Sequence, residues 1–392
     1  MKKNTVTIGM VGAGRATQLH MQAYKRVTTV DIRFKTIVSS TYEKSKIGKE
    51  KFGFEIAGKS FEDILLDSEI DIVDICTPPY THENMIISAI KADKHVICEK
   101  PLTGYYGDEG DKTPIGLNVS KVHMYERTLE KLERLKSVVA DSDKKFMFAE
   151  NFIYAPAIQK MAEIISKKKS KILCIKGEES LKGSSSPVAG DWDKTGGGTF
   201  TRTGGHPLAA ALWLKQTEAK AKGIEIKPIS VVADVGYITN TLNEYEHRHI
   251  AARPNDVEDF GTAIITFSDS TKAIIIATDT LLGGSKNYVE AYCNDSTLYA
   301  NLTLSNMMST YFLDEDNLED VYISEMLPSK TGWNNPTVID EIVRGYSGEI
   351  QDFVEAVAFN KEAVSNFDLA YETTKVTYAA YMSAQSGKKI NL

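Results

Sequence analysis

The residues best suited to do chemistry lie in one stretch, KTGGGTFTRTGGHPLAAALWL, from Lys194 to Leu214. Residues 196–205 contain five glycines, with Arg202 between them, and His206 follows directly. A neutral histidine can take a proton from a hydroxyl group, so His206 is a candidate general base. Glycines let a ligand approach the backbone, and the apolar run that follows predicts a buried helix beginning near His206.

Arg202 has two predicted roles. If one helix carries Arg202 and His206, four residues apart, the fixed charge of the arginine disfavours the imidazolium form and keeps the histidine ready to accept a proton. If Arg202 points away, its guanidinium can bind a carboxylate of a substrate or of a neighbouring subunit. A histidine in this position can also be an ordinary core residue.

A second group of polar residues follows two apolar, strand-like runs. The motifs are CTPPYTH and CEKPL, and their candidate ligand-binding residues are Thr77, Pro78, His82, Glu99 and Lys100. In open α/β sheets, ligands bind just beyond the carboxyl ends of the strands. We therefore expect these residues to line a ligand-binding edge.

The N-terminal stretch VTIGMVGAGRATQLH predicts a strand, a glycine turn and a helix. Gly12 and Gly14 match the first two glycines of a dinucleotide fingerprint, while Thr17 replaces the third. Gly12 allows the tight turn, and Gly14 lets a pyrophosphate approach the helix N-terminus, which begins at Arg15 and Ala16. We expect these residues to bind a dinucleotide.

The end of the next predicted strand bears on the choice of dinucleotide. Ser39, Ser40 and Thr41 stand where a carboxylate normally binds the adenosine ribose, and Lys44 lies one turn further on. No acid repels a 2′-phosphate here, but no arginine follows directly to bind one. NAD and NADP both fit this pattern.

Strands alternate with helices over the first part of the chain, which predicts a doubly wound parallel sheet, the Rossmann arrangement, in an α/β protein. We place this domain at residues 1–150. Residues 151–392 contain strand-like runs separated by short turns, which predict an α/β domain with a large, mostly antiparallel open sheet. We expect this domain to bind substrate and mediate oligomerisation, with the C-terminal helix packing back on the first domain.

The composition excludes several classes of protein. The 392 residues carry a formal net charge of −7 without a basic stripe, which argues against a nucleic-acid partner. Apolar runs are shorter than the roughly 20 residues that span a bilayer, so we expect no membrane partner. The four cysteines are scattered, which predicts reduced thiols in a cytoplasmic protein. Glu246, His247 and His249 lack an evident fourth ligand, so we expect no metal.

The motifs VGAGRATQLH, CTPPYTH, EKPL, GGGTFTRTGGHPL and the C-terminal AAYMSAQSGKKINL resemble the Gfo/Idh/MocA family of sugar and cyclitol oxidoreductases. The resemblance covers essentially the whole chain. It implies an NAD(P)-dependent enzyme that forms a dimer or larger homo-oligomer, with NAD as the expected cofactor.

The resemblance also implies roles for single residues. Lys100 corresponds to the lysine that contacts the nicotinamide ribose and the substrate hydroxyl, and His206 to the histidine that acts as general base or acid. Asn151 and Tyr154 lie where family members contact substrate. Arg202 departs from the family, which usually has an aspartate at that position.

Residues 177–200, GEESLKGSSSPVAGDWDKTGGGTF, are similar to a branch that oxidises glycosides at C3, including C-glycoside 3-oxidases. Three functions stay open. The chain oxidises a secondary hydroxyl of a sugar, glycoside or cyclitol, or reduces the matching ketone; it cleaves glycosides through a 3-keto intermediate with tightly held NAD; or it is a non-catalytic sensor of dinucleotide and sugar. The insertion at residues 103–121 is expected to be a surface loop or a lid.

Overall fold

The computed structural model describes residues 5–184, 186, 188–303, 308, 310–319, 321, 323, 329–336 and 340–392. Ser185 and Pro187 of the glycoside-oxidase motif therefore lie outside the described residues. The chain forms two compact units. The first unit contains Met1–Tyr105, Glu126–Tyr154 and Gly345–Lys375, and the second contains Tyr106–Tyr125, Ala155–Arg344 and Val376–Leu392.

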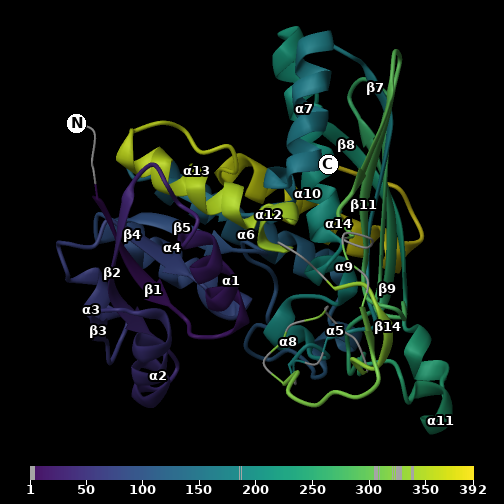
Figure 1. Ribbon diagram of the computed structural model, residues 1–392. Helices are drawn as coiled ribbons and strands as arrows, with labels where there is room; N and C mark the ends of the chain where they lie inside the picture. The colour runs from purple at the N-terminus through teal and green to yellow at the C-terminus, as the bar shows by residue number, and fades with distance from the viewer. Residues whose placement is uncertain are drawn as a thin grey trace. The chain divides into compact units, whose positions relative to one another are not determined.

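The first unit contains a six-stranded sheet whose strands all run parallel, in the order β3-β2-β1-β4-β5-β6 (Figure 1). Its strands are β1 (Thr5–Val11), β2 (Asp31–Val38), β3 (Ile56–Ala57), β4 (Ile72–Ile75), β5 (His95–Glu99) and β6 (Phe146–Ala149). This is the Rossmann strand order, with its switch point between β1 and β4. The predicted doubly wound parallel sheet is confirmed.

Helices connect these strands, and a return of the chain near its C-terminus adds to them. They are α1 (Arg15–Tyr24), α2 (Tyr42–Phe52), α3 (Glu62–Leu65), η1 (Pro79–Thr81), α4 (His82–Lys91), α6 (Lys121–Ala140), η2 (Asn151–Tyr154), α13 (Tyr346–Ala358) and α14 (Phe367–Ser386). Helix α13 packs beside α1 within the first unit. The division between the units falls inside α6 and α14.

The second unit is built on a seven-stranded sheet in the order β12-β11-β7-β10-β9-β8-β15. Its strands are β7 (Ile172–Ser180), β8 (Pro228–Gly236), β9 (Phe260–Phe267), β10 (Lys272–Thr278), β11 (Lys286–Cys293), β12 (Thr297–Asn301) and β15 (Ile390–Asn391). Every neighbouring pair is antiparallel except β7 with β10. The predicted large, mostly antiparallel sheet is confirmed.

The remaining elements of the second unit are short, apart from two long helices. They are α5 (Ile115–Asn118), α7 (Pro156–Lys168), α8 (Trp192–Thr195), α9 (Thr199–Arg202), α10 (Gly205–Lys222), η3 (Ile238–Thr241), α11 (Glu244–His247), β13 (Thr310–Phe312), β14 (Gly332–Asn334) and α12 (Asp340–Val343). Among the described residues, no helix combines the length and the hydropathy needed to cross a membrane.

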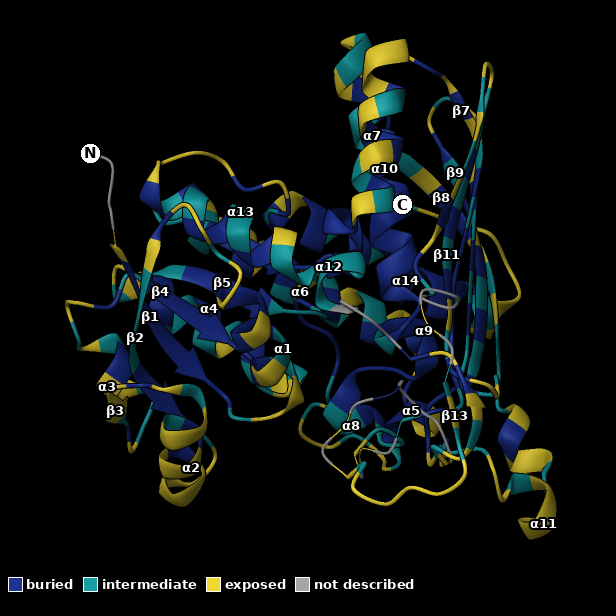
Figure 2. Ribbon diagram, in the orientation of Figure 1, coloured by how far each residue is buried: buried dark blue, intermediate teal, exposed yellow. Residues whose placement is uncertain are grey.

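One face of the large sheet is covered by α10, with α7 beside it (Figure 1). Strand β10 alternates as such a strand should, burying Ala273, Ile275 and Ala277 on the covered face. Residues 205–212 of α10 are all buried, as their colour shows in Figure 2. This apolar helix is the one that the run HPLAAALWL predicted, and it fixes His206 against the sheet.

Candidate active site

Gly12 and Gly14 form the turn between β1 and α1, and each is a glycine for a different reason. Gly12 has a φ of +113°, and a Cβ there would lie 2.2 Å from the carbonyl oxygen of Cys76. Only glycine fits such a turn. At Gly14 the backbone is extended, and an added Cβ would meet no described atom within 4 Å. No described residue therefore fills the space beside Gly14.

Helix α1 begins at this unfilled space with Arg15 and Ala16. Its N-cap is Gly14, which has no side chain to accept a hydrogen bond, and its first turn carries no acidic residue. The first N–H groups of a helix and its dipole attract anions such as a pyrophosphate. These residues of the first unit therefore fit a dinucleotide.

The edge after β2 carries hydroxyl groups and a lysine. The backbone N–H of Ser39 donates to Oγ of Ser45 (2.9 Å), and Thr41 caps α2 by accepting from the N–H of Lys44 (3.3 Å). Nζ of Lys44 donates to Oγ of Ser40 (3.3 Å). The predicted ribose-binding edge thus consists of a capped helix start with one amine beside it.

The strand ends of β4 and β5 are joined by a histidine. The ring of His82 is fully buried, with Nδ1 2.8 Å from the carbonyl oxygen of Pro101 and Nε2 3.0 Å from that of Thr77. Burial lowers the pKa of His82, while the two carbonyl oxygens oppose that shift. His82 was predicted to contact the cofactor; the structure places it beneath the edge, where it holds Thr77, Pro78 and Pro101 together.

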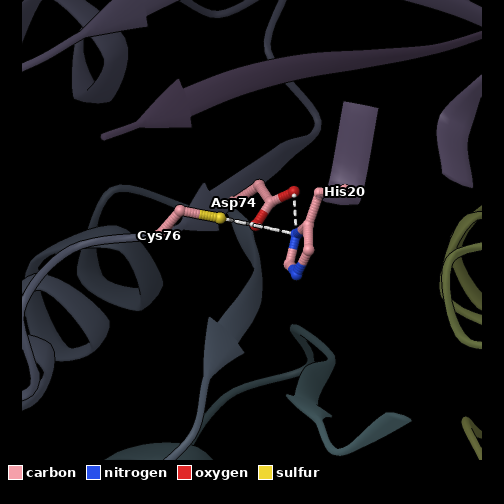
Figure 3. A group of neighbouring side chains, drawn as sticks. All are labelled: His20, Asp74 and Cys76. Atoms are coloured by element: carbon pink, nitrogen blue, oxygen red, sulfur yellow. Dashed lines mark hydrogen bonds and ion pairs between the residues drawn. The ribbon is translucent and has the colours of Figure 1, made fainter. Parts of the chain in front are cut away.

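A buried network that the sequence analysis missed lies behind Glu99 and Lys100. Nδ1 of His20, on α1, lies 2.9 Å from Oδ2 of Asp74 and 3.5 Å from Sγ of Cys76 (Figure 3). Nε2 lies 3.2 Å from Oε1 of Glu99, close enough for an ion pair. Oε2 of Glu99 accepts from the backbone N–H of Lys100 (3.0 Å).

The charge of this network follows from its geometry. Nδ1 of His20 lies within hydrogen-bond distance of Asp74, and Nε2 lies within ion-pair distance of Glu99 without a hydrogen bond to it, so both carboxylates favour the imidazolium form. Burial alone would lower the pKa of His20, but Asp74 and Cys76 outweigh it, and the pKa is raised well above the usual value. A charged residue in the otherwise apolar strand IVDI was the signal available in the sequence.

Helix α13 adds an acid to the same region of the first unit. Glu349 is buried, and burial raises its pKa well above the usual range, with Glu99 and Glu150 adding to the effect. The nearby His20 opposes this rise. We expected the C-terminal helix to pack back on the first domain, and residues 345–375, which include α13 and the start of α14, belong to the first unit.

Asn151 and Tyr154, the predicted substrate residues, lie in η2 directly after β6 and are both buried. The hydroxyl of Tyr154 donates to Oδ2 of Asp352 (2.8 Å) and accepts from the N–H of Ser365 (2.9 Å). Tyr154 therefore ties η2 to α13 and to the segment before α14. Its role toward substrate stays a prediction.

In the second unit, Arg202 and His206 do not share one helix. Helix α9 ends at Arg202, the N–H of Gly204 turns back to the carbonyl oxygen of Thr199 (3.0 Å), and α10 begins at Gly205. The continuous helix that the first role of Arg202 requires is absent from this described segment. That premise was wrong: Thr203 and Gly204 separate the two helices, and Gly204 lies so close to the preceding turn that a Cβ there would be 2.6 Å from the carbonyl oxygen of Phe200.

Arg202 instead forms an ion pair with Asp279, the residue after β10. Asp279 is almost fully buried and also accepts from Oγ1 of Thr199 (3.2 Å). Burial raises the pKa of Asp279, while Arg202 opposes that rise. The charge of Arg202 is therefore balanced within the protein. His206 has a carboxylate nearby as well: its Nε2 lies 3.8 Å from Oε2 of Glu179, at the end of β7.

The glycine run before α9 is shaped by the protein's own side chains. A Cβ at Gly197 would lie 2.3 Å from the hydroxyl of Tyr381, and one at Gly198 would lie 1.9 Å from the carbonyl oxygen of Glu258. We expected these glycines to make room for a ligand; instead they make room for Tyr381 and Glu258. Glu258 accepts from the N–H of Gly198 and of Phe200 (both 2.9 Å) and from the hydroxyl of Tyr381 (2.7 Å).

The end of the insertion at residues 103–121 supports the same segment. Nζ of Lys121 lies 3.7 Å from the centre of the Trp192 ring and donates to the carbonyl oxygen of Gly116 (2.6 Å). Burial lowers the pKa of Lys121 to about 8, although Glu258 and Asp256 oppose the shift. This part of the insertion is packed structure rather than a surface loop.

Comparison with known proteins agrees with the architecture of the first unit. Residues 6–108 match the model of the oxidoreductase family with an NAD-binding Rossmann fold, GFO_IDH_MocA. The chain is 34% identical over 96 residues to myo-inositol 2-dehydrogenase of Thermotoga maritima, and 28% identical over 160 residues to levoglucosan dehydrogenase of Pseudarthrobacter phenanthrenivorans. The first alignment covers 24% of this chain and 28% of the relative, and the second covers 39% of this chain and 35% of the relative. The chain therefore aligns with well under two thirds of either relative.

Solved structures resemble the fold over the full length. GenD2 from gentamicin A biosynthesis, in complex with NAD, superposes with a TM-score of 0.78 at 20% identity, covering 100% of this chain and 97% of that one. Levoglucosan dehydrogenase in complex with NADH and levoglucosan gives a TM-score of 0.70 at 19% identity, covering 99% of each chain.

Proposed function

We propose that the protein is a nicotinamide-dependent dehydrogenase, because residues 6–108 match the model of the oxidoreductase family with an NAD-binding Rossmann fold. It oxidises a secondary hydroxyl of a sugar, glycoside or cyclitol, or reduces the matching ketone. The observation that carries this proposal is the uncapped start of α1 beside the unfilled space at Gly14. Relatives named for myo-inositol and levoglucosan support the substrate class.

The roles follow from the chemistry of the side chains. A nicotinamide cofactor held at the start of α1 would supply the acceptor for the hydride that leaves the carbinol carbon. Lys100 stabilises the negative charge that develops on the substrate oxygen. The backbone N–H of Lys100 donates to the carboxylate of Glu99, which holds the residue in place. His206 accepts the hydroxyl proton. The first unit binds the dinucleotide, while the second unit provides His206 for the substrate.

Finer statements belong to the same proposal. NAD is the cofactor, supported by the neighbours solved with NAD or NADH. C3 of a glycoside is the position oxidised, supported by the similarity of residues 177–200 to glycoside 3-oxidases. The protein acts in the cytoplasm as a homo-oligomer.

The test is turnover on a panel of inositols, free sugars and glycosides with NAD or NADP, followed by NADH absorbance and by product mass. We expect reduced cofactor and a product whose mass is two hydrogens lower than that of the substrate. Cleaved glycoside without net reduction of the cofactor would identify the hydride-borrowing reaction instead. Binding of both ligands without any product would identify a sensor.

A further inference from the structure

A buried carboxyl group lies near the start of α13, in the first unit. Glu349 is 1% exposed, and neither of its carboxyl oxygens has a hydrogen-bond partner among the described residues. Burying a charged group without a partner costs far more than burying a neutral one. Because most buried polar groups in folded proteins are satisfied, this exception calls for a functional explanation.

The groups around Glu349 are mostly acidic. Helix α13 packs against α1, η2 and β1, and β1 contains no titratable side chain. The charged and titratable groups that act on Glu349 are His20 of α1, Asp74 of β4, Glu99 of β5, Glu150 after β6 and the hydroxyl of Tyr154 in η2. In this set, one imidazole stands among several carboxyl groups, and it already lies between Asp74 and Glu99.

These acids lie in the half of the Rossmann sheet that would receive the nicotinamide. The half built on β1, β2 and β3 carries the glycine turn and the ribose-binding edge, so it takes the adenosine part of a dinucleotide. The switch point between β1 and β4 then directs the other part over β4, β5 and β6. Glu99 ends β5, Glu150 follows β6, and both act on Glu349.

The two forms of the cofactor differ in charge at the nicotinamide. The oxidised ring carries a positive charge, and the reduced ring is neutral. A cation that enters a buried region favours the ionised form of a nearby carboxyl group, whereas a neutral ring does not. Burial raises the pKa of Glu349 and so favours its protonated form, with Glu99 and Glu150 adding to this effect and His20 opposing it.

We propose that Glu349 distinguishes the oxidised from the reduced cofactor by exchanging a proton. When the cationic ring binds, the O–H bond of Glu349 breaks, the proton goes to solvent, and the carboxylate balances the charge of the ring. When the ring is reduced it becomes neutral, and Glu349 takes a proton back from solvent. This inference rests on the proposed function for the identity of the cofactor.

Glu355 provides a matched control on the same helix. Its carboxylate accepts from Oγ1 of Thr29 (2.8 Å) and pairs with Nζ of Lys361 (2.7 Å), so its charge is already balanced. Glu349→Gln and Glu355→Gln each remove one carboxyl group from α13 and keep the size of the side chain. ADP-ribose is the matched ligand, because it keeps the adenosine and the pyrophosphate but lacks the nicotinamide.

The first experiment counts protons. Calorimetric titration in two buffers of different ionisation enthalpy measures how many protons leave when NAD⁺, NADH or ADP-ribose binds. The unaltered protein and Glu355→Gln should release about one proton more with NAD⁺ than with NADH or ADP-ribose. Glu349→Gln should release equal numbers with all three ligands. Equal release in the unaltered protein overturns the proposal.

The same titrations give the affinities. Glu349→Gln should weaken the binding of NAD⁺ about tenfold and leave the binding of NADH and ADP-ribose nearly unchanged. In the unaltered protein, NAD⁺ should bind more tightly as pH rises, because its binding releases a proton, while the Kd of NADH should not follow. This difference should vanish in Glu349→Gln. An equal loss of affinity for NAD⁺ and NADH would show a structural glutamate and overturn the selection.

A second measurement needs no altered chain. The infrared band of a protonated glutamic acid, identified by carbon-13 labelling, should disappear from the unaltered protein when NAD⁺ binds and stay when NADH binds. A band that NAD⁺ leaves unchanged overturns the proposal even if Glu349→Gln fails to fold. If the unaltered protein binds neither form of NAD or NADP, the proposed function itself fails. Binding of both forms with equal proton release overturns only the role of Glu349.

Discussion

Lys100 carries a charged side chain on a backbone that is held at the end of β5. Its N–H is held by Glu99, which His20 holds in turn, so the lysine projects from a rigid strand end. Lys100→Met should lower kcat by about 10²–10³-fold, the loss typical of removing one group that stabilises a developing charge. The affinity for NADH, measured by fluorescence titration, should change little.

The exposed Lys91 on α4 is the matched control, since Lys91→Met removes an equal charge from the first unit. Turnover of Lys91→Met should equal that of the unaltered protein. Near-normal turnover of Lys100→Met would remove Lys100 from the reaction.

Arg202 is expected to contribute to stability rather than to proton transfer. In Arg202→Gln the carboxylate of Asp279 stays buried without its counter-charge. We expect this to lower the unfolding free energy by about 3 kcal/mol. This value is at the lower end for buried pairs because Arg202 is partly exposed. Adding Asp279→Asn should recover most of that loss. Urea unfolding of both single variants and the double variant measures this coupling.

The same variants distinguish the alternatives. A higher KM for anionic substrates in Arg202→Gln, with stability unchanged, would instead favour substrate binding by the guanidinium.

The sequence singled out His206, Arg202 and Lys100 as candidates because their motifs are local. It could not identify their partners, since Asp279 is 77 residues from Arg202 along the chain and meets it only through the end of β10. The position of Glu179 near His206 depends in the same way on how α10 packs against β7. Such contacts arise from tertiary structure, which local spacing does not encode.

At the scale of elements, His20 joins α1 to β4 and β5 through its two ring nitrogens. Its pKa is raised in the folded protein, so between pH 6.5 and that raised value the folded state holds a proton that the unfolded state has lost. The stabilisation is complete below pH 6.5 and is lost as pH rises through the folded pKa. His20→Gln should therefore differ most from the unaltered protein at low pH.

Urea unfolding of both proteins across this range measures the difference, which should be about 3–5 kcal/mol below pH 6.5 and should shrink as pH rises. A difference that is constant with pH would mean that His20 is neutral in the fold.

Lys121 has the opposite pH dependence. Its pKa is lowered from 10.5 to about 8, so between these values the unfolded state binds the proton that the folded state has released. The unfolding free energy should rise with pH across this window, by about 3 kcal/mol in total. Lys121→Met should lack the rise. An equal slope in both proteins would show that Lys121 keeps its proton beside Trp192.

The elements themselves were largely predictable, because apolar alternation and helical spacing mark β10 and α10 directly. The break between α9 and α10 at Thr203 and Gly204 was not predictable, because glycines permit a continuous helix as well as a break. The partners of Gly197 and Gly198 were not predictable either. Tyr381 lies in α14, the last long helix of the chain, and the residues next to it in the sequence do not indicate that it contacts a glycine run.

At the scale of the whole molecule, the proposed function assigns the dinucleotide to the first unit and the proton acceptor His206 to the second. A ligand that binds only the folded state stabilises it, by about 2.7 kcal/mol at a concentration 100 times its Kd. NADH should therefore slow hydrogen exchange mainly in the first unit. This unit includes residues 345–375, although the sequence suggested a domain boundary near residue 150. A sugar substrate should add protection around residues 199–206 of the second unit.

Gly14→Val is the variant that tests this division. The backbone at Gly14 is extended and an added Cβ meets no described atom within 4 Å, so the fold should survive. The new side chain would occupy the place proposed for the pyrophosphate, so NADH should no longer protect the first unit. Gly53→Asn, at a helix end with equally free space, should leave the protection intact. Undiminished protection in Gly14→Val, or protection by NADH confined to the second unit, would contradict the assignment of the dinucleotide to α1.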